Sequence, residues 1–273
     1  MSVINTNVSA LRAQNAMTVN ARAQSTAMEQ LSTGSKVNSA KDDAAGLAIG
    51  QSMTAQVRGL NQAVRNLNDG INMMQTAEGA LNETSNMLQR MRELAVQSAN
   101  GTYSESQRGY LQVEFAALSS QIGKIASDTK WNNTSLLSSE TTFTFQAGKD
   151  ANQTISIAIA SMGTAGLGIS IAQASIGVAV ANAAAAITTL DTAIGLVNAQ
   201  RATIGAGINQ MTYAVDNLSN IASNTAASRS TIMDTDYATA STQLSKTQII
   251  QQAATAMLAQ ANQQPQSVLA LLK

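Results

Sequence analysis

A coiled-coil pattern of apolar residues runs from Ile187 to Ala222 and constrains the fold more than any other feature. The apolar side chains recur in alternating steps of three and four residues, and Arg201 is the only charged residue in register. This spacing is typical of one face of a long helix, which at ~1.5 Å per residue would extend about 50 Å. Such a stripe needs a partner helix of similar length to cover it. Its large apolar positions are Ile187, Leu190, Ile194, Val197, Ile204, Ile208, Met211, Val215 and Leu218.

A second apolar run, in the other half of the chain, provides the expected partner. Its main positions recur every seven residues, and the alternate positions are apolar at first and then polar, at Glu78, Ser85 and Arg92. We therefore expect two long helices that pack as an antiparallel coiled coil, with a shorter third helix around Leu111–Ile125 packed against them. The apolar positions of this run are Leu60, Val64, Leu67, Ile71, Met74, Leu81 and Leu88.

The segment after the third helix predicts a β-hairpin at about residues 141–160. Thr142–Phe145 and Thr154–Ile159 alternate between polar and apolar residues, and Ala147–Asn152 between them is rich in turn formers. The following Gly163–Gly168 lacks the residues of a phosphate-binding loop, so we expect a flexible connector. The predicted fold class is mostly α: an elongated antiparallel coiled-coil helical bundle with one β-hairpin, plus paired terminal helices.

Both ends of the chain have helical apolar spacing but very little charge. Arg12 and Arg22 are the only charges before Glu29, and Lys246 is the only one from Tyr237 to Leu272. A solvated helix normally has a charged outer face, so we expect these helices to be surrounded by protein. Residues 1–42 and 232–273 are predicted to form a terminal paired-helix domain, and residues 43–231 a helical rod domain. The apolar positions expected to mediate association are Ile4, Val8, Leu11, Leu244, Ile250, Met257 and Leu258.

The composition argues against several classes of function. Histidine and cysteine are absent, which removes the commonest general base and the commonest metal ligands. We therefore expect no enzyme activity, no cofactor and no metal. Lysine plus arginine balance aspartate plus glutamate at 16 each, and no basic cluster interleaves with aromatic residues, so nucleic acid is not an expected partner.

A membrane association is also not expected. No charged residue stands between Asp150 and Asp191, but polar residues and glycines interrupt this segment and no basic flank follows it. The N-terminus, whose first charge is Arg12, lacks the basic and apolar regions of a cleaved signal peptide.

Five short stretches of the chain form a distinctive set. They are Leu31–Ile49, which contains Lys41-Asp-Asp-Ala-Ala-Gly-Leu-Ala-Ile49, and Ile4–Asn7, Glu78–Leu81, Gln89–Val96 and Met257–Lys273. The stretch Leu31–Ile49 is similar to the signature of bacterial flagellin, and the resemblance to that family extends from end to end. It implies a structural subunit that self-assembles into the helical filament of the bacterial flagellum for swimming motility, with the terminal domain as the filament core.

The resemblance also implies a minimal form of flagellin. Larger flagellins insert outer domains between the two helical halves, whereas here about 25 residues separate the hairpin from the return helix, too few for another domain. The implied partners are other copies of the chain, the flagellar export apparatus, an export chaperone that binds the C-terminal segment, and hook-associated and cap proteins. The implied location is the extracellular filament, reached without a cleaved signal peptide.

Four positions match the surface by which the host innate immune receptor binds flagellins. They are Gln89, Arg90, Leu94 and Glu114, and we expect them to be exposed in the monomer and covered in the filament. Arg90 and Leu94 are one helical turn apart and would share a face.

Two alternative functions remain open. A hook–filament junction protein shares the architecture of the terminal helices with flagellin, although the amino-acid sequence of Lys41–Ile49 favours a filament flagellin. A non-motility surface adhesin would need a concave aromatic or charged site, and none is evident. An inserted zinc protease, which some flagellins carry, would need histidine ligands that this chain lacks.

Overall fold

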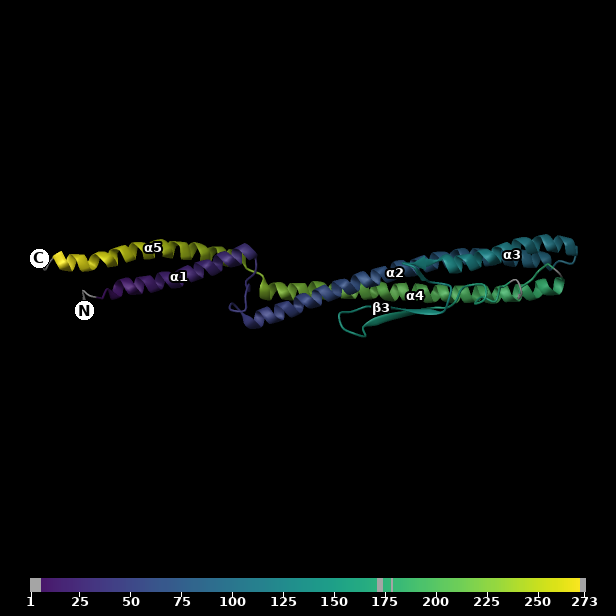
Figure 1. The fold of residues 1–273 in the computed structure, drawn as a ribbon, viewed down its shortest axis with the longest axis horizontal. Coiled ribbons are helices and arrows are strands. Elements are labelled where there is room, and N and C mark those ends of the chain that lie inside the picture. The colour runs from purple at the N-terminus through teal and green to yellow at the C-terminus, as the bar shows by residue number, and fades with distance from the viewer. Residues whose placement is uncertain (1–5, 171–173, 178, 271–273) are drawn as a thin grey trace. The chain divides into compact units, whose positions relative to one another are not determined.

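The computed structural model describes residues 6–170, 174–177 and 179–270, and it is dominated by five helices in those ranges (Figure 1). Two short antiparallel strand pairs complete the fold, which confirms the predicted mostly α class with a hairpin. The helices are α1 Val8–Thr33, α2 Ala44–Ser98, α3 Glu105–Asp128, α4 Val180–Met233 and α5 Tyr237–Ala270. The strands are β1 Lys130–Trp131, β2 Thr134–Ser135, β3 Thr141–Gln146 and β4 Thr154–Ile159.

The chain divides into two compact units. The first combines the chain up to Val57 with the chain from Ser223 onward, and the second is Arg58–Ala222. The sequence placed the division at 42/43 and 231/232, so the observed terminal unit also takes in the first residues of α2 and the last turns of α4. The predicted domain boundaries stay predictions.

Local hydrogen bonds explain where the helices begin and end. The side chain of Asn7 accepts a hydrogen bond from the Ala10 amide at the start of α1, and Gly34 ends that helix with φ of 71°, a left-handed conformation that favours glycine. Before α2, the Ser39 hydroxyl and amide donate to the Asp42 carboxylate, which lowers the pKa of Asp42. The carboxylate of Asp43 accepts from the Gly46 amide at 2.8 Å and so caps α2.

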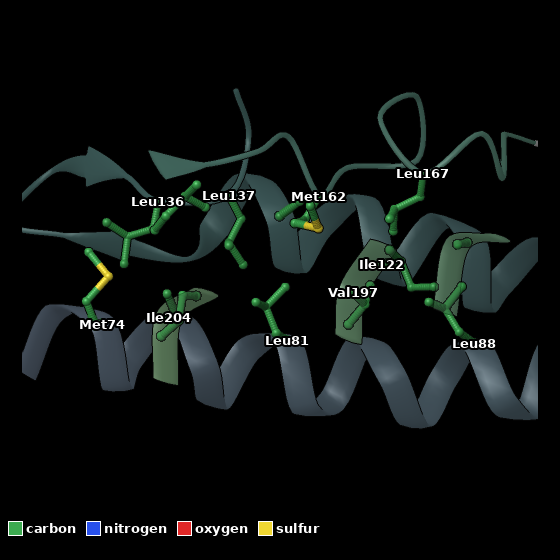
Figure 2. Packing of buried hydrophobic residues seen from close by; sticks show 14 of the residues in the cluster. Met74, Leu81, Leu88, Ile122, Leu136, Leu137, Met162, Leu167, Val197 and Ile204 are labelled. Carbon is green, nitrogen blue, oxygen red and sulfur yellow. The ribbon is translucent and has the colours of Figure 1, made fainter. Parts of the chain in front are cut away.

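In the second unit, each long helix buries two columns of side chains. One column is the predicted one and consists of large residues. The buried large residues are Leu60, Leu67, Met74, Leu81 and Leu88 in α2, and Leu190, Val197, Ile204, Met211 and Leu218 in α4. Figure 2 shows several of them, together with Ile122 of α3 and residues of the connecting loops.

The second buried column differs from the prediction by one residue. The predicted alternate positions, Val64, Ile71, Ile187, Ile194, Ile208 and Val215, are only half-buried and flank the core. The second buried column lies one residue before the alternate positions, polar ones included. Its members are mostly small or polar: Ala63, Gly70, Ala77, Thr84, Ala186, Ala193, Gln200 and Gly207. The reason is that α3, the β3–β4 hairpin and the connecting loops form a third layer against the two long helices. A helix in a two-helix coiled coil buries one seam, whereas a helix packed against two partners buries a wider face.

The third layer approaches α2 and α4 closely because the facing residues are small. A Cβ atom on Gly207 would overlap the buried side chain of Ile157 in β4, and one on Gly70 would lie 2.8 Å from Phe145 of β3. The buried amide of Gln200 in α4 donates to the Ala158 carbonyl at 3.0 Å and accepts from the Ala160 amide at 3.1 Å. The hairpin is therefore fixed to α4 by both packing and hydrogen bonds.

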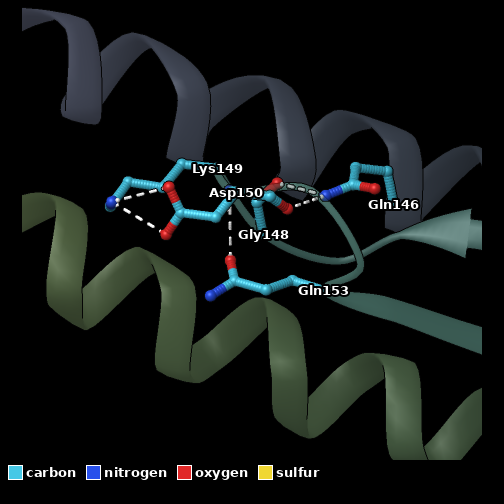
Figure 3. Close-up of polar contacts among 5 residues, drawn as sticks. All are labelled: Gln146, Gly148, Lys149, Asp150 and Gln153. Carbon is cyan, nitrogen blue, oxygen red and sulfur yellow. Dashed lines mark hydrogen bonds and ion pairs between the residues drawn. The ribbon is translucent and has the colours of Figure 1, made fainter.

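The predicted hairpin is confirmed, with Thr141 opposite Ile159 and Gln146 opposite Thr154. Its turn is held by its own polar groups (Figure 3). The amide of Gln146 donates to the carbonyls of Gly148 and Asp150 at 3.0 and 2.6 Å, and the Asp150 amide donates to Gln153 at 3.2 Å. A smaller pair, β1 and β2, encloses Asn132 and Asn133, whose positive φ values fit a tight hairpin turn.

The expectation of a flexible connector after the hairpin is wrong for the described residues. Leu167 and Ile169 are buried in the hydrophobic core. The buried Ser119 hydroxyl donates to the Ile169 carbonyl at 3.0 Å, and the buried Ser98 hydroxyl donates to the Ile176 carbonyl at 2.6 Å. Apolar side chains dock this loop, and buried polar side chains satisfy its backbone.

We expect Gly207→Ala to destabilise the second unit by ~1–3 kcal/mol, because the added methyl group must displace Ile157 from a filled core. Chemical unfolding of the monomer, followed by circular dichroism, measures the effect. Gly195→Ala is the matched control in the same helix. Nothing lies within 4 Å of its added Cβ, so better helix propensity should stabilise the monomer by ~0.5–1 kcal/mol. Equal effects of the two substitutions would contradict the close packing of the hairpin on α4.

Candidate functional site

The first candidate site is the pair of terminal helices, α1 and α5, which lie side by side and antiparallel (Figure 1). Two asparagines of α1 fix their register. The side-chain amide of Asn20 donates to the Thr247 carbonyl at 2.8 Å and to the Gln251 side chain at 3.2 Å. The amide of Asn7 donates to the Ala261 carbonyl at 2.8 Å.

The contact face between these helices consists mostly of small and polar residues. Asn20, Ala27, Ala240 and Thr247 are its buried members. Small side chains let the two backbones approach closely. They also bury little apolar area, so the pair gains only modest hydrophobic stabilisation.

The large apolar residues of both helices lie outside this contact face. Val19 is 60% exposed and Met257 is 67% exposed. We use the term outer stripes for the exposed apolar residues of this kind: Val8, Leu11 and Val19 on α1, and Ile249, Ile250 and Met257 on α5. Of the other residues predicted for association, Leu244 and Leu258 are half-buried, and Ile4 lies outside the described residues.

The outer stripes have few charged neighbours. Arg12, Arg22 and Glu29 are the charges of α1, and Lys246 is the charge of α5. A helix pair that places small residues inside and large apolar residues in solvent reverses the usual pattern of a soluble helix. Large apolar side chains that stay exposed along a helix pair mark a candidate site for association with protein.

The second candidate site is the group predicted to face the innate receptor. Gln89, Arg90 and Glu114 are exposed, and Arg90 joins α2 to α3. Its Nε donates to the Glu114 carboxylate at 2.9 Å and its Nη1 to the Glu93 carboxylate at 3.0 Å. These hydrogen bonds raise the pKa of Arg90 above its usual value.

The expectation that Leu94 is exposed is wrong. Leu94 is 1% exposed and belongs to the hydrophobic cluster that also contains Met91 and Phe115. It lies three residues after Met91 and four before the buried Ser98, which places it on the broad buried face of α2. The residues of this group that remain accessible are the polar ones.

Charged residues that interrupt the predicted seam form ion pairs at the edge of the core. Arg92 donates from Nε to Asp191 of α4 at 2.6 Å, and Arg201 lies 3.9 Å from Glu78 of α2. The hydrogen bond from Arg92 lowers the pKa of Asp191. Because the side chains of both pairs are between 33% and 52% exposed, solvent screens them, and they contribute more to the alignment of the two helices than to their stability.

Helix α4 also meets the length and composition criterion for a membrane-spanning helix, with a mean hydropathy of 1.5 in its most apolar window. A core helix meets the same criterion. Buried residues recur along α4 from Ala183 to Met211 and belong to the core of the second unit. Among the described residues, His, Cys, Asp and Glu side chains form no group of three that could hold a metal ion.

A chain built of long paired helices, with uncovered apolar stripes on its terminal pair, has the features of a self-associating structural protein. Family models match it as the bacterial flagellin N-terminal helical region at residues 4–142 and the C-terminal helical region at 187–272. The chain belongs to the bacterial flagellin family, and it is a short form of that family's structural filament subunit.

Individual relatives cover the whole chain. Flagellin of Halalkalibacterium halodurans is 42% identical over 272 residues, which span 99% of this chain and 100% of that protein. The flagellar filament 31.3 kDa core protein of Treponema maltophilum is 40% identical over 285 residues, with the same coverage. A crystal structure of Bacillus cereus flagellin is 30% identical with a TM-score of 0.48, and the match covers 60% of this chain and 94% of that one. The names of the Halalkalibacterium and Treponema relatives favour a filament subunit over a junction protein or an adhesin.

We expect Arg92→Gln to return the pKa of Asp191 toward its ordinary value of 3.8, because the substitution removes the hydrogen bond that lowers it. Carboxyl NMR titration of the monomer measures the change. A lowered pKa in the folded chain means that the pair stabilises the fold at neutral pH and that this contribution is lost as the pH falls through the folded pKa. Arg201→Gln is the control and should leave Asp191 unchanged. The same pKa in wild type and Arg92→Gln would contradict the pair.

Proposed function

We propose that this flagellin polymerises by burying the outer stripes of α1 and α5 against neighbouring copies of the chain. The observation that carries the proposal is the reversed pattern of the terminal pair, in which small residues form the internal contact and Val19 and Met257 are exposed. The contacts are heterologous, so subunits add to a growing end instead of closing a ring. The product is the helical filament that propels a swimming cell.

Folding of the terminal pair is coupled to assembly. In the free chain, α1 and α5 are held by a few buried small residues and by hydrogen bonds such as those of Asn20. These contacts stabilise the pair only slightly, whereas ordering two helices has a large cost in conformational entropy. In the filament, burial of the outer stripes adds the missing hydrophobic free energy. The terminal residues therefore form the filament core domain, with residues 43–231 as the rod and no outer domain.

The same stripes account for the proposed partners before and after assembly. A chain exported unfolded through the flagellar export apparatus needs its apolar C-terminal segment covered, which is the role of a chaperone that binds there. Hook-associated and cap proteins cover the terminal helices of the subunits at the two ends of the filament. The exported chains end in the extracellular filament.

We expect Val19→Asp to abolish polymerisation and to leave the helix content of the monomer unchanged, because Val19 is exposed in the free chain. Burial of an unpaired carboxylate strongly opposes association. Sedimentation of the polymer as a function of chain concentration measures the critical concentration. Val19→Ile is the matched control and should polymerise like wild type. The proposal fails if Val19→Asp polymerises at the wild-type critical concentration.

A second proposal is that the monomer is bound by the host innate receptor for flagellin through Gln89, Arg90 and Glu114. The supporting observation is the exposed Arg90, held by Glu93 and Glu114 in a fixed orientation on one face of α2 and α3. Such an arginine can exchange its internal carboxylates for an acidic or polar group of a partner. Leu94, being buried, supports the face from beneath.

We expect Arg90→Ala to weaken monomer binding to the receptor ectodomain by roughly tenfold or more, which is the usual effect of removing a charged contact at the centre of an interface. Surface plasmon resonance with immobilised receptor measures the affinity, and circular dichroism checks the fold. Arg65→Ala, at another exposed arginine of α2, is the control and should bind normally. If the wild-type monomer does not activate receptor-bearing cells, or Arg90→Ala signals fully, the assignment is wrong.

A further inference from the structure

The methionines of this chain differ widely in exposure. Met257 of α5 and Met28 of α1 are 67% and 55% exposed, whereas Met74, Met91 and Met211 in the second unit are completely covered. Oxidation of a methionine thioether to the sulfoxide follows its accessibility to the oxidant. An oxidant in solution therefore reaches the terminal helices before the core of the second unit.

The two exposed methionines occupy different positions on the terminal pair. Met257 lies seven residues after Ile250 and so shares its side of α5, within the outer stripe. Met28 lies nine residues after Val19, two and a half turns along α1, and so points away from the outer stripe of that helix. Met257 is exposed, whereas the next residue of α5, Leu258, is half-buried. Oxidation of Met257 can therefore leave the α1–α5 pair intact.

We propose that Met257 is a peroxide-sensitive modification site whose oxidation prevents the free chain from polymerising. The sulfur attacks one oxygen of hydrogen peroxide, the O–O bond breaks, an S–O bond forms and water leaves. The sulfur loses two electrons, and the peroxide gains them. The polar sulfoxide requires a hydrogen-bond partner that an apolar interface lacks, so its burial opposes association.

This inference rests on the proposed polymerisation through the outer stripes. It adds that free and assembled chains differ in sensitivity, because assembly covers Met257 and shields it from the oxidant. It also makes the block reversible, because methionine sulfoxide reductases return the sulfoxide to the thioether.

The test uses the full-length monomer treated with hydrogen peroxide. Peptide mapping by mass spectrometry gives the oxidation rate of each methionine, and sedimentation gives the critical concentration for polymerisation. We expect Met257 and Met28 to be oxidised well before Met74 and Met91. The critical concentration of the oxidised chain should rise by at least about tenfold, as expected for loss of one buried apolar side chain.

Two variants separate the exposed methionines. Met257→Leu should polymerise after peroxide treatment as it does before, whereas Met28→Leu should remain as sensitive as wild type. Treatment of the oxidised wild type with both epimer-specific reductases should restore polymerisation, which provides a test that does not depend on either variant. Assembled filaments should show slower oxidation of Met257 than monomers do.

The possible results of these experiments test the oxidation proposal separately from the proposed polymerisation. Oxidation of Met257 without a change in critical concentration overturns the inference and leaves the proposed function standing. The same holds if Met28→Leu, and not Met257→Leu, removes the sensitivity, or if Met257 is oxidised no faster than Met74. Failure of the untreated wild-type chain to polymerise overturns the proposed function and the inference together.

Discussion

Close packing against small residues is the constraint on which the second unit depends. Gly70 and Gly207 leave room for Phe145 and Ile157 of the hairpin, and Gln200 hydrogen-bonds the end of that hairpin to α4. Without this space, β3 and β4 could not cover the apolar face of two long helices. A two-stranded hairpin alone is marginal in water, so the hairpin and the helix pair stabilise one another.

In the first unit, small residues also bring helices together, but the large apolar residues are left exposed. Around Asn20 and Thr247 the small residues bring α1 and α5 together, but no further layer covers the large side chains of these helices within the described part of the chain. In the second unit, large residues such as Leu81 and Leu190 are fully covered. The contrast separates the unit that folds on internal contacts from the unit whose apolar surface, in our proposal, is covered by other copies of the chain.

The sequence predicted the helices and the hairpin better than it predicted which residues of each helix are buried. The long helices and the hairpin followed from the periodicity of large apolar residues, because that signal depends on residue type alone. The second buried column was missed because Ala193, Gln200 and Gly207 are not large and apolar. These residues recur every seven positions in the sequence, but the recurrence predicts a buried face only when a third layer is known to cover it.

The same limitation explains the errors at Leu94 and in the connecting loop. A two-helix coiled coil would leave Leu94 at the edge of the seam, but α3 widens the buried face of α2 to include it. The glycines of Gly163–Gly168 suggested flexibility, whereas Leu167 and Ile169 dock the loop. The hydroxyl of Ser119 then satisfies the Ile169 carbonyl, a long-range contact that local composition does not reveal. Errors of this kind arise wherever tertiary packing decides the outcome.

A subunit that must stay free before it polymerises faces two opposing requirements. Its outer stripes must be apolar enough to drive association, and its low charge removes repulsion between copies but also lowers the solubility of the free chain. Methionine at position 257 suits the first requirement, because a flexible, polarisable thioether adapts to the neighbour that it contacts. The cost is chemical: among the large apolar residues of the outer stripes, this is the one that an oxidant converts into a polar group. In our proposal, the thioether that lets Met257 pack in an assembly therefore also makes the free chain sensitive to oxidants.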